Sequence, residues 1–341
     1  MTEADLRTAE PRRPGPGRDA VRTSGHSASG RPTGYGRRLP QRLGRLGIVA
    51  LAGALALGAC PAGQHADSAY AVEGALHHPG DGAGSAARHP VESLRVEVLQ
   101  TLPHDPKAFT EGLEMSGGTL YESTGLPAQS SVRAGTPGKA PKARATLPAP
   151  LFGEGITLLG QTLWQLTWRD RIALERDAKT LAEVRRVPYP DDGWGMCLQR
   201  ARRRLVTSDG SARLTFRDPH TLARTGDVVV TDRGHPVSKL NELECAGAAV
   251  YANVLFTDRI VRIDPASGAV TASIDASGLI RGDELAPGAT LNGIAAIPGT
   301  DQFLITGKFW PTMFRVTFVP ARTTGGPGQA ERRESRRKPV A

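Results

Sequence analysis

The sequence predicts an all-β fold, a five-bladed β-propeller, from two regularities. Between residues 94 and 318, short runs rich in Val, Leu, Ile, Thr and Phe alternate with turn signals every eight to twelve residues, and almost no stretch has helical periodicity. Similar turn sequences recur at residues 177–181, 218–222 and 264–268, which are 41 and 46 residues apart, and a weaker copy lies at 134–138. A repeat of this length is typical of a propeller blade with four strands.

The number of blades follows from the length of the core. About 225 residues divided by about 45 per blade gives five blades, with six as the alternative. A sandwich or a barrel would also contain many short strands, but neither predicts turns that return at blade length. We expect the strand around Val96 to Thr101 to close the last blade, because an open ring would leave two unpaired edges.

The basic character of the chain belongs to its ends. The formal charge is +9 overall, but residues 1–59 carry +6 and residues 321–341 carry +4, which leaves −1 for residues 60–320. A nucleic-acid binder concentrates Lys and Arg on a folded face. We therefore expect no nucleic acid partner.

The N-terminal region predicts export. Arginines precede the uncharged residues 46–60, which are too few to span a bilayer and resemble a signal peptide within an N-terminal extension, residues 1–59. Residues 57–60 (LGAC) resemble the site at which bacterial lipoproteins are cleaved and lipidated, here at Cys60; an ordinary signal peptide with later cleavage is the alternative. We expect a lipoprotein on the extracellular face of the membrane, or a secreted protein.

The composition predicts a flexible tether over 60–90, the propeller domain over 91–320 and a disordered basic tail over 321–341.

Five segments place a polar or indole group beside glycine or within an apolar strand, one per blade: residues 109–113 (FTEGL), 152–156 (FGEGI), 193–195 (GWG), 240–244 (LNELE) and 291–295 (LNGIA). Their polar or indole residues are Glu111, Glu154, Trp194, Asn241 and Asn292, which follow one another at 43, 40, 47 and 51 residues. Glycine on an inner strand allows close approach of a backbone or a ligand. We expect these five sites to converge on one axis.

Together with LYESTG, QLTW, SDG, TDRIVRIDP and TGKFWP, these motifs resemble the plant-type glutaminyl-peptide cyclotransferases, also called glutamine cyclotransferases, over residues 95–318. The resemblance indicates a bacterial exported member of this acyltransferase family. It implies a five-bladed propeller that converts the N-terminal glutaminyl residue of a peptide or protein to pyroglutamyl and releases ammonia. It also implies that no metal or other cofactor takes part, and we expect a monomer.

The resemblance assigns roles to particular residues. Glu154 matches the carboxylate that shuttles the proton, and Lys308 matches a lysine that polarises the substrate amide or tunes Glu154. The resemblance also implies that five side chains contact the substrate, namely an amide, two indoles and two others: Asn241, Trp168, Trp194, Phe109 and Glu111. The core histidines His104, His220 and His235 lie far apart in sequence, so we expect no histidine-based catalytic metal, whereas the sequence leaves a structural cation open.

Two departures leave other functions open. Family members commonly have Gln at the position of Glu111, and a pocket indole of the family falls on Leu255, next to Phe256. A catalytically weak propeller that binds peptides or cell-wall components is therefore the alternative, and a metal-dependent lactonase-type propeller is a third interpretation. Cys197 and Cys245 either pair or are small buried hydrophobic residues, and we favour the unpaired state.

Overall fold

The computed structural model describes residues 90–282 and 285–321. In this part the secondary structure consists of strands and one short 3-10 helix, η1 (Arg200–Arg202), so the all-β prediction is confirmed. The extension with its signal peptide, Cys60, the tether as far as residue 89 and the tail from residue 322 lie outside the described residues. The described residues contain no helix long and apolar enough to cross a membrane.

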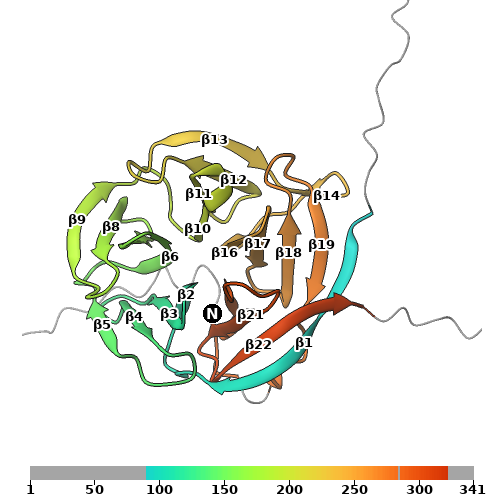
Figure 1. Cartoon of the computed structure of the whole chain (residues 1–341), viewed down its shortest axis with the longest axis horizontal. Helices are drawn as coiled ribbons and strands as arrows, with labels where there is room; N and C mark the ends of the chain where they lie inside the picture. Colours follow the sequence, from blue (N-terminus) through green and yellow to red (C-terminus); the bar gives the residue numbers. More distant parts are fainter. Residues whose placement is uncertain (1–89, 283–284, 322–341) are drawn as a thin grey trace, which may run out of the picture. The chain divides into compact units, whose positions relative to one another are not determined.

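Twenty of the 22 strands form five four-stranded groups, called units 1 to 5 here (Figure 1). Unit 1 is β2 (Thr110–Ser116), β3 (Thr119–Thr124), β4 (Ser131–Gly135) and β5 (Ala143–Thr146). Unit 2 is β6 (Gly153–Leu159), β7 (Thr162–Thr167), β8 (Ile172–Asp177) and β9 (Glu183–Pro188). Unit 3 is β10 (Met196–Gln199), β11 (Arg204–Thr207), β12 (Arg213–Arg217) and β13 (Arg224–Val229). Unit 4 is β16 (Leu240–Ala246), β17 (Ala249–Val254), β18 (Arg259–Ile263) and β19 (Val270–Asp275), and unit 5 is β20 (Thr290–Ala296), β21 (Phe303–Lys308), β22 (Thr312–Pro320) and β1 (Glu92–Pro103). A small hairpin, β14 (Thr231–Asp232) and β15 (His235–Pro236), follows unit 3.

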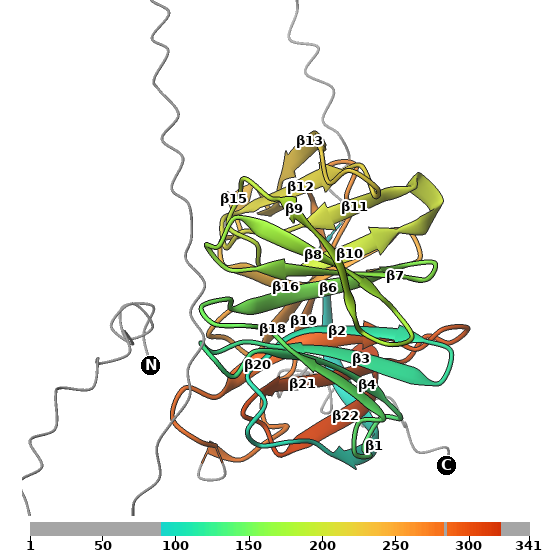
Figure 2. The ribbon, with the colours of Figure 1, turned by 90° about the vertical axis from the view of Figure 1, so that its left-hand side faces the viewer.

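The first and last described strands pair with each other, which confirms the predicted closure. Strand β1 pairs antiparallel with β22, with Val96 opposite Phe318 and Thr101 opposite Phe314. Figures 1 and 2 show these two strands side by side, although they come from opposite ends of the described chain. The start of β1 also pairs in parallel with β19, which joins units 4 and 5 into one eight-stranded sheet.

The recurring turn sequences connect the third and fourth strands of a unit. In three of them an aspartate side chain accepts backbone N–H groups of its own turn: Asp177 from Thr180, Asp218 from Thr221 and Asp264 from Ala266. Such turns are favoured where the chain reverses. Only four copies exist because the fourth strand of unit 5, β1, comes from the beginning of the described chain and no turn joins it to β22.

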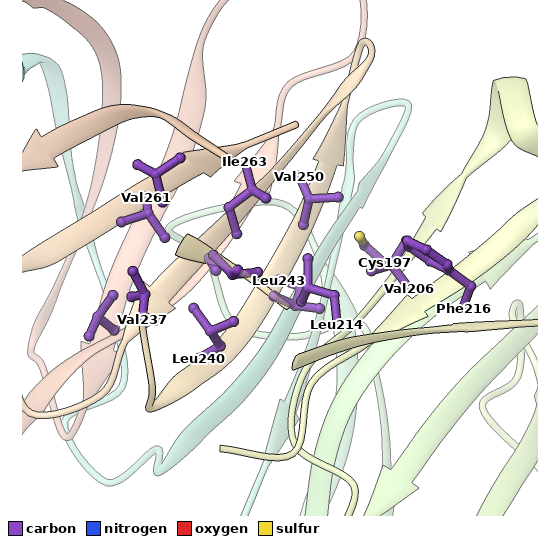
Figure 3. Packing of buried hydrophobic residues seen from close by; sticks show 14 residues of the cluster. Cys197, Val206, Leu214, Phe216, Val237, Leu240, Leu243, Val250, Val261 and Ile263 are labelled. Atoms are coloured by element: carbon purple, nitrogen blue, oxygen red, sulfur yellow. The ribbon is translucent and has the colours of Figure 1, made fainter. Parts of the chain in front are cut away.

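The apolar core lies between neighbouring units. The cluster drawn in Figure 3 combines Val206 and Leu214 of unit 3 with Val250 and Ile263 of unit 4. Four other clusters join units 1 and 2, 2 and 3, 4 and 5, and 5 and 1. Each sheet therefore buries its faces against its neighbours, as blade-length repeats require.

The innermost strands contact one another in a closed cycle, β2 to β6, β10, β16, β20 and back to β2. The glycines of the sequence motifs permit these contacts. A Cβ atom on Gly155 would lie 2.4 Å from the carbonyl oxygen of Trp194, and one on Gly195 would lie 2.2 Å from that of Asn241. The Glu242 side chain adds to the cycle by accepting hydrogen bonds from the backbone N–H groups of Leu113 and Ile294 in two other units.

Cys197 of β10 and Cys245 of β16 form a disulfide, so our preference for unpaired cysteines is wrong. The close approach of β10 and β16 at Gly195 brings the two Cα atoms to 5.4 Å, within the range that a disulfide bridges. A sequence separation of 48 residues gives no indication of this proximity.

Candidate active site

Each functional residue of the inner strands lies in an irregularity of its strand. The pairing register shifts between Thr110 and Gly112 in β2, and corresponding shifts enclose Glu154 in β6, Asn241 in β16 and Asn292 in β20. A β-bulge redirects a side chain away from the ladder and is common beside active sites. These bulges lie near the N-terminal ends of the inner strands. The side chains that they redirect therefore meet at the same end of the ring that these strands form.

One cavity collects most of the predicted residues. It is lined by three titratable groups, one amide, two indoles and three further apolar side chains: Glu111, Glu154, Lys308, Asn241, Trp168, Trp194, Phe152, Leu255 and Phe256. The lining comes from units 1, 2, 4 and 5 and from the segment that leads into unit 3. The predicted convergence is therefore present in the structure.

Lys308 and Glu111 form a buried ion pair at this cavity. The Lys308 Nζ lies 2.5 Å from both carboxylate oxygens of Glu111, and both residues are less than 10% exposed. Asn292 donates from Nδ2 to Oε2 of Glu111 over 3.2 Å and to the carbonyl oxygen of Thr110 over 2.9 Å. The ammonium also lies 4.3 Å from the ring centroid of Phe109, a favourable cation–π position.

Glu154 is buried beside this ion pair and hydrogen-bonds to Glu111. Burial raises the pKa of Glu154 well above its ordinary value, and the negative charge of Glu111 raises it further. Burial also raises the pKa of Glu111, but there Lys308 and the hydrogen bond from Glu154 oppose the shift. The geometry pairs the carboxyl group of Glu111 with Lys308, and the raised pKa of Glu154 favours keeping the proton on Glu154.

Asn241 offers an unused acceptor. Its Oδ1 is buried and has no hydrogen-bond partner among the described residues, which is unusual because buried polar groups are normally paired. The backbone around it is fixed, since Ser208 donates from Oγ to the Asn241 carbonyl oxygen over 2.6 Å and accepts from the N–H of Gly195 over 2.8 Å. An acceptor held in this way is prepared for a donor from a bound molecule.

The indoles form the half-buried walls of the cavity. Trp194 packs so closely on Gly210 that a Cβ there would lie 2.6 Å from the indole ring, which explains the SDG motif. Trp168 packs edge-to-face on Phe152, with ring centroids 5.5 Å apart. Phe109 is not among the residues that line the cavity; it lies behind them and contacts Phe152 edge-on at 6.0 Å.

The rim of the cavity carries an exposed aromatic side chain. Leu255 is buried, whereas Phe256 is 46% exposed. Phe256 has φ 63° and Lys239 has φ 64°, both in the left-handed region that non-glycine residues seldom adopt. The Lys239 Nζ lies 5.5 Å from the centroid of the Phe256 ring.

A second buried network fixes the strands that carry the ion pair. His104 places Nδ1 2.6 Å from the Trp310 carbonyl oxygen and Nε2 3.0 Å from Oε1 of Glu122. Both of these partners are acceptors, so both ring nitrogens donate and the imidazole is cationic. Burial opposes this charge, but the hydrogen bond and charge of Glu122 outweigh burial and raise the pKa of His104. Glu122 also accepts from Arg133 and from the Thr110 hydroxyl, so one network holds the start of β2 and the end of β21.

The site contains residues that we did not predict. Asn292 belongs to a motif with the correct spacing, but nothing in the sequence indicates that it contacts Glu111. Phe152 begins the FGEG motif and lines the cavity, and Phe256 lines it beside Leu255. Among the described residues, no group of three or more His, Cys, Asp and Glu side chains is arranged to hold a metal ion.

Comparisons with known proteins agree with one another. The sequence profile of the glutamine cyclotransferase family matches residues 70–318. The Arabidopsis thaliana protein named glutaminyl-peptide cyclotransferase is 36% identical over an alignment of 255 residues, and the match covers 72% of this chain and 78% of that protein. The crystal structure of Myxococcus xanthus glutaminyl cyclase matches with a TM-score of 0.64 and 36% identity, covering 68% of this chain and all of that chain. The matched segment of the family includes every candidate site residue from Phe109 to Lys308.

Proposed function

The chain belongs to the glutamine cyclotransferase family, and from this premise we propose that it cyclises the N-terminal glutaminyl residue of peptides and proteins to a pyroglutamyl residue with release of ammonia. The observation that carries the proposal is the buried cluster of Glu111, Lys308 and Glu154 in the same cavity as the unpartnered oxygen of Asn241. In such a site a carboxyl group, a hydrogen-bond acceptor and an ammonium can all contact the carboxamide of one bound glutaminyl residue.

Glu154 serves as the proton shuttle. The neutral α-amine of the substrate attacks the carbon of its own γ-carboxamide, a new C–N bond forms, and the carbonyl electron pair moves to oxygen. Glu154 gives its proton to the departing amide nitrogen, and the oxyanion re-forms the carbonyl as the bond from carbon to that nitrogen breaks and ammonia leaves. The ring nitrogen then returns one proton to Glu154. A carboxyl group with a raised pKa is suited to both transfers near neutral pH.

Lys308 and Asn241 position the reacting groups. An ammonium has three N–H donors, and Glu111 engages two of them, so the third is available to the developing oxyanion. Oδ1 of Asn241 accepts a hydrogen bond from the substrate's amine or carboxamide N–H. Trp168 and Trp194 hold the glutaminyl side chain folded back towards its own amine. The amine and the carboxamide carbon are then oriented for reaction, which lowers the entropic cost of bringing them together.

The substitution Glu154→Gln tests this assignment. It preserves size and removes the transferable proton, so we expect kcat for ammonia release from a Gln-initiated peptide to fall by about 10²- to 10⁴-fold with the fold retained. Glu183→Gln, on the exposed outer strand β9, is the matched control and should leave kcat unchanged. A Glu154→Gln enzyme that turns over at the wild-type rate would show that another group moves the proton. A peptide-binding protein without activity would release no ammonia in any form.

The proposal extends to architecture. The five units, with inner strands in a closed cycle and apolar clusters between neighbours, support a five-bladed β-propeller as the catalytic domain over residues 91–320. The proposal includes a monomeric enzyme. The reaction as written uses only side chains of the chain and no metal.

The proposal also extends to location. Disulfides persist in oxidising compartments, so the pairing of Cys197 with Cys245 supports export. A signal peptide that ends at residue 59, lipidation of Cys60, a flexible tether and a basic tail complete the proposal, with the enzyme on the extracellular face of the membrane or secreted. Mass spectrometry of the mature N-terminus tests the anchor: a diacylglyceryl Cys60 is expected, and an unmodified later residue would indicate ordinary secretion.

A further inference from the structure

We propose that Phe256 forms the subsite for the residue that follows the N-terminal glutamine, and that the enzyme favours peptides with a large apolar residue at that second position. This inference rests on the proposed cyclase activity and deepens it by naming a substrate class. Its basis is the one residue of the cavity lining that combines a large apolar surface with high exposure.

The exposure of the lining residues indicates how a peptide substrate enters the cavity. Glu111, Glu154, Asn241 and Lys308 are between 1% and 6% exposed, so the polar end of the cavity is closed to solvent. The two indoles are half-buried, and Phe256 is 46% exposed. A glutaminyl residue whose amine and carboxamide reach the polar end must therefore extend its following residue past the rim.

Phe256 is placed at this rim at a conformational cost. A bulky side chain with φ 63° occupies a backbone region that L-residues seldom adopt, and such strain is typical of functional sites. The turn that holds it is defined by hydrogen bonds from the Leu255 N–H to the Lys239 carbonyl oxygen over 2.9 Å and from the Thr257 N–H to the Val254 carbonyl oxygen over 3.1 Å. The other large apolar side chains that are exposed in the described part of the chain lie on outer strands: Val98, Leu99, Val184 and Val229.

Charge at the rim adds a second preference. The Lys239 ammonium lies 5.5 Å from the Phe256 ring centroid. A cationic second residue would meet this like charge, whereas an apolar side chain would pack on the Phe256 ring. We therefore expect the order large apolar, then glycine, then lysine at the second position.

The experiment measures kcat/KM for three amidated dipeptides, Gln-Phe, Gln-Gly and Gln-Lys, so that no terminal carboxylate interacts with Lys239. An aromatic pair predicts that the wild type prefers Gln-Phe over Gln-Gly by about threefold to tenfold, mainly through KM. Phe256→Asn should reduce the preference to about one, because Asn tolerates the left-handed region and has no apolar face. Phe256→Leu should retain part of the preference, and Val184→Asn on β9 should retain all of it.

The outcomes separate this inference from the function on which it rests. If the wild type releases no ammonia from any of the three peptides, the proposed function fails. If it cyclises Gln-Gly but shows no preference for Gln-Phe, or if Phe256→Asn keeps the wild-type preference, the Phe256 subsite is overturned while the cyclase activity stands.

Discussion

Replacing Glu111 by Gln should change the pH at which the enzyme works. The site contains two buried carboxyl groups and one buried ammonium, so one carboxyl group, Glu154, keeps its proton. Burial and the charge of Glu111 both raise the pKa of Glu154. Glu111→Gln removes the second cause and leaves Lys308 to interact with Glu154, which lowers the pKa of Glu154.

The size of the effect follows from the loss of the negative charge of Glu111 beside the Glu154 carboxyl group. Neighbouring charges shift carboxyl pKa values in proteins by about one to three units. We therefore expect the pKa of Glu154 to fall in Glu111→Gln by enough to be resolved in a pH profile.

The assay is the pH dependence of kcat/KM for ammonia release. The profile should be bell-shaped, with one limb set by the substrate amine and the other by the proton on Glu154. The amine limb belongs to the free substrate and should be the same in both enzymes. The Glu154 limb should move to lower pH in Glu111→Gln and stay in place in the Glu183→Gln control. A Glu154 limb that stays in place or moves to higher pH would refute the electrostatic reasoning.

Two further predictions concern stability. Replacing both Cys197 and Cys245 by Ala removes a cross-link over 48 residues and should lower the free energy of unfolding by about 2–4 kcal/mol, measured by urea denaturation; an unchanged value would contradict the disulfide. His104→Gln should cost about 3 kcal/mol at pH 6, because it breaks a buried charge pair with Glu122. The pKa of His104 is raised on folding, so its stabilisation is complete below the unfolded value of about 6.5 and declines as the pH rises through the folded value. The difference between wild type and variant should therefore narrow from pH 6 to 9, and a widening difference would contradict a cationic His104.

The sequence was sufficient to predict the features that depend only on the position of a residue within the repeat. Turn sequences at blade length predicted equivalent positions for Asp177, Asp218 and Asp264, and motif spacing predicted that Glu111, Glu154 and Asn241 converge on one axis. In the structure these three residues line one cavity. Both inferences need only the repeat, because equivalent positions in successive units face the same way. Glycine beside these residues predicted the close approach of the inner strands, which the contacts of Gly155 and Gly195 confirm.

The sequence was insufficient for contacts that depend on the distance between residues of two different units. The disulfide depends on a Cα separation of 5.4 Å between two strands, and no sequence spacing encodes that value. The pairing of Lys308 with Glu111, rather than with Glu154, depends on side-chain geometry in units 1 and 5. The cationic state of His104 depends on a carbonyl group 206 residues away.

The central claim is that this chain cyclises N-terminal glutamine with its own side chains. The most direct measurement incubates the purified protein with a Gln-initiated peptide, with and without a chelator, and follows both ammonia and the mass of the peptide. The account predicts equal ammonia release in both samples, one ammonia lost per peptide, and no reaction with the corresponding Ala-initiated peptide. A folded protein that releases no ammonia would contradict the claim of activity, and release abolished by the chelator would contradict the claim that side chains suffice.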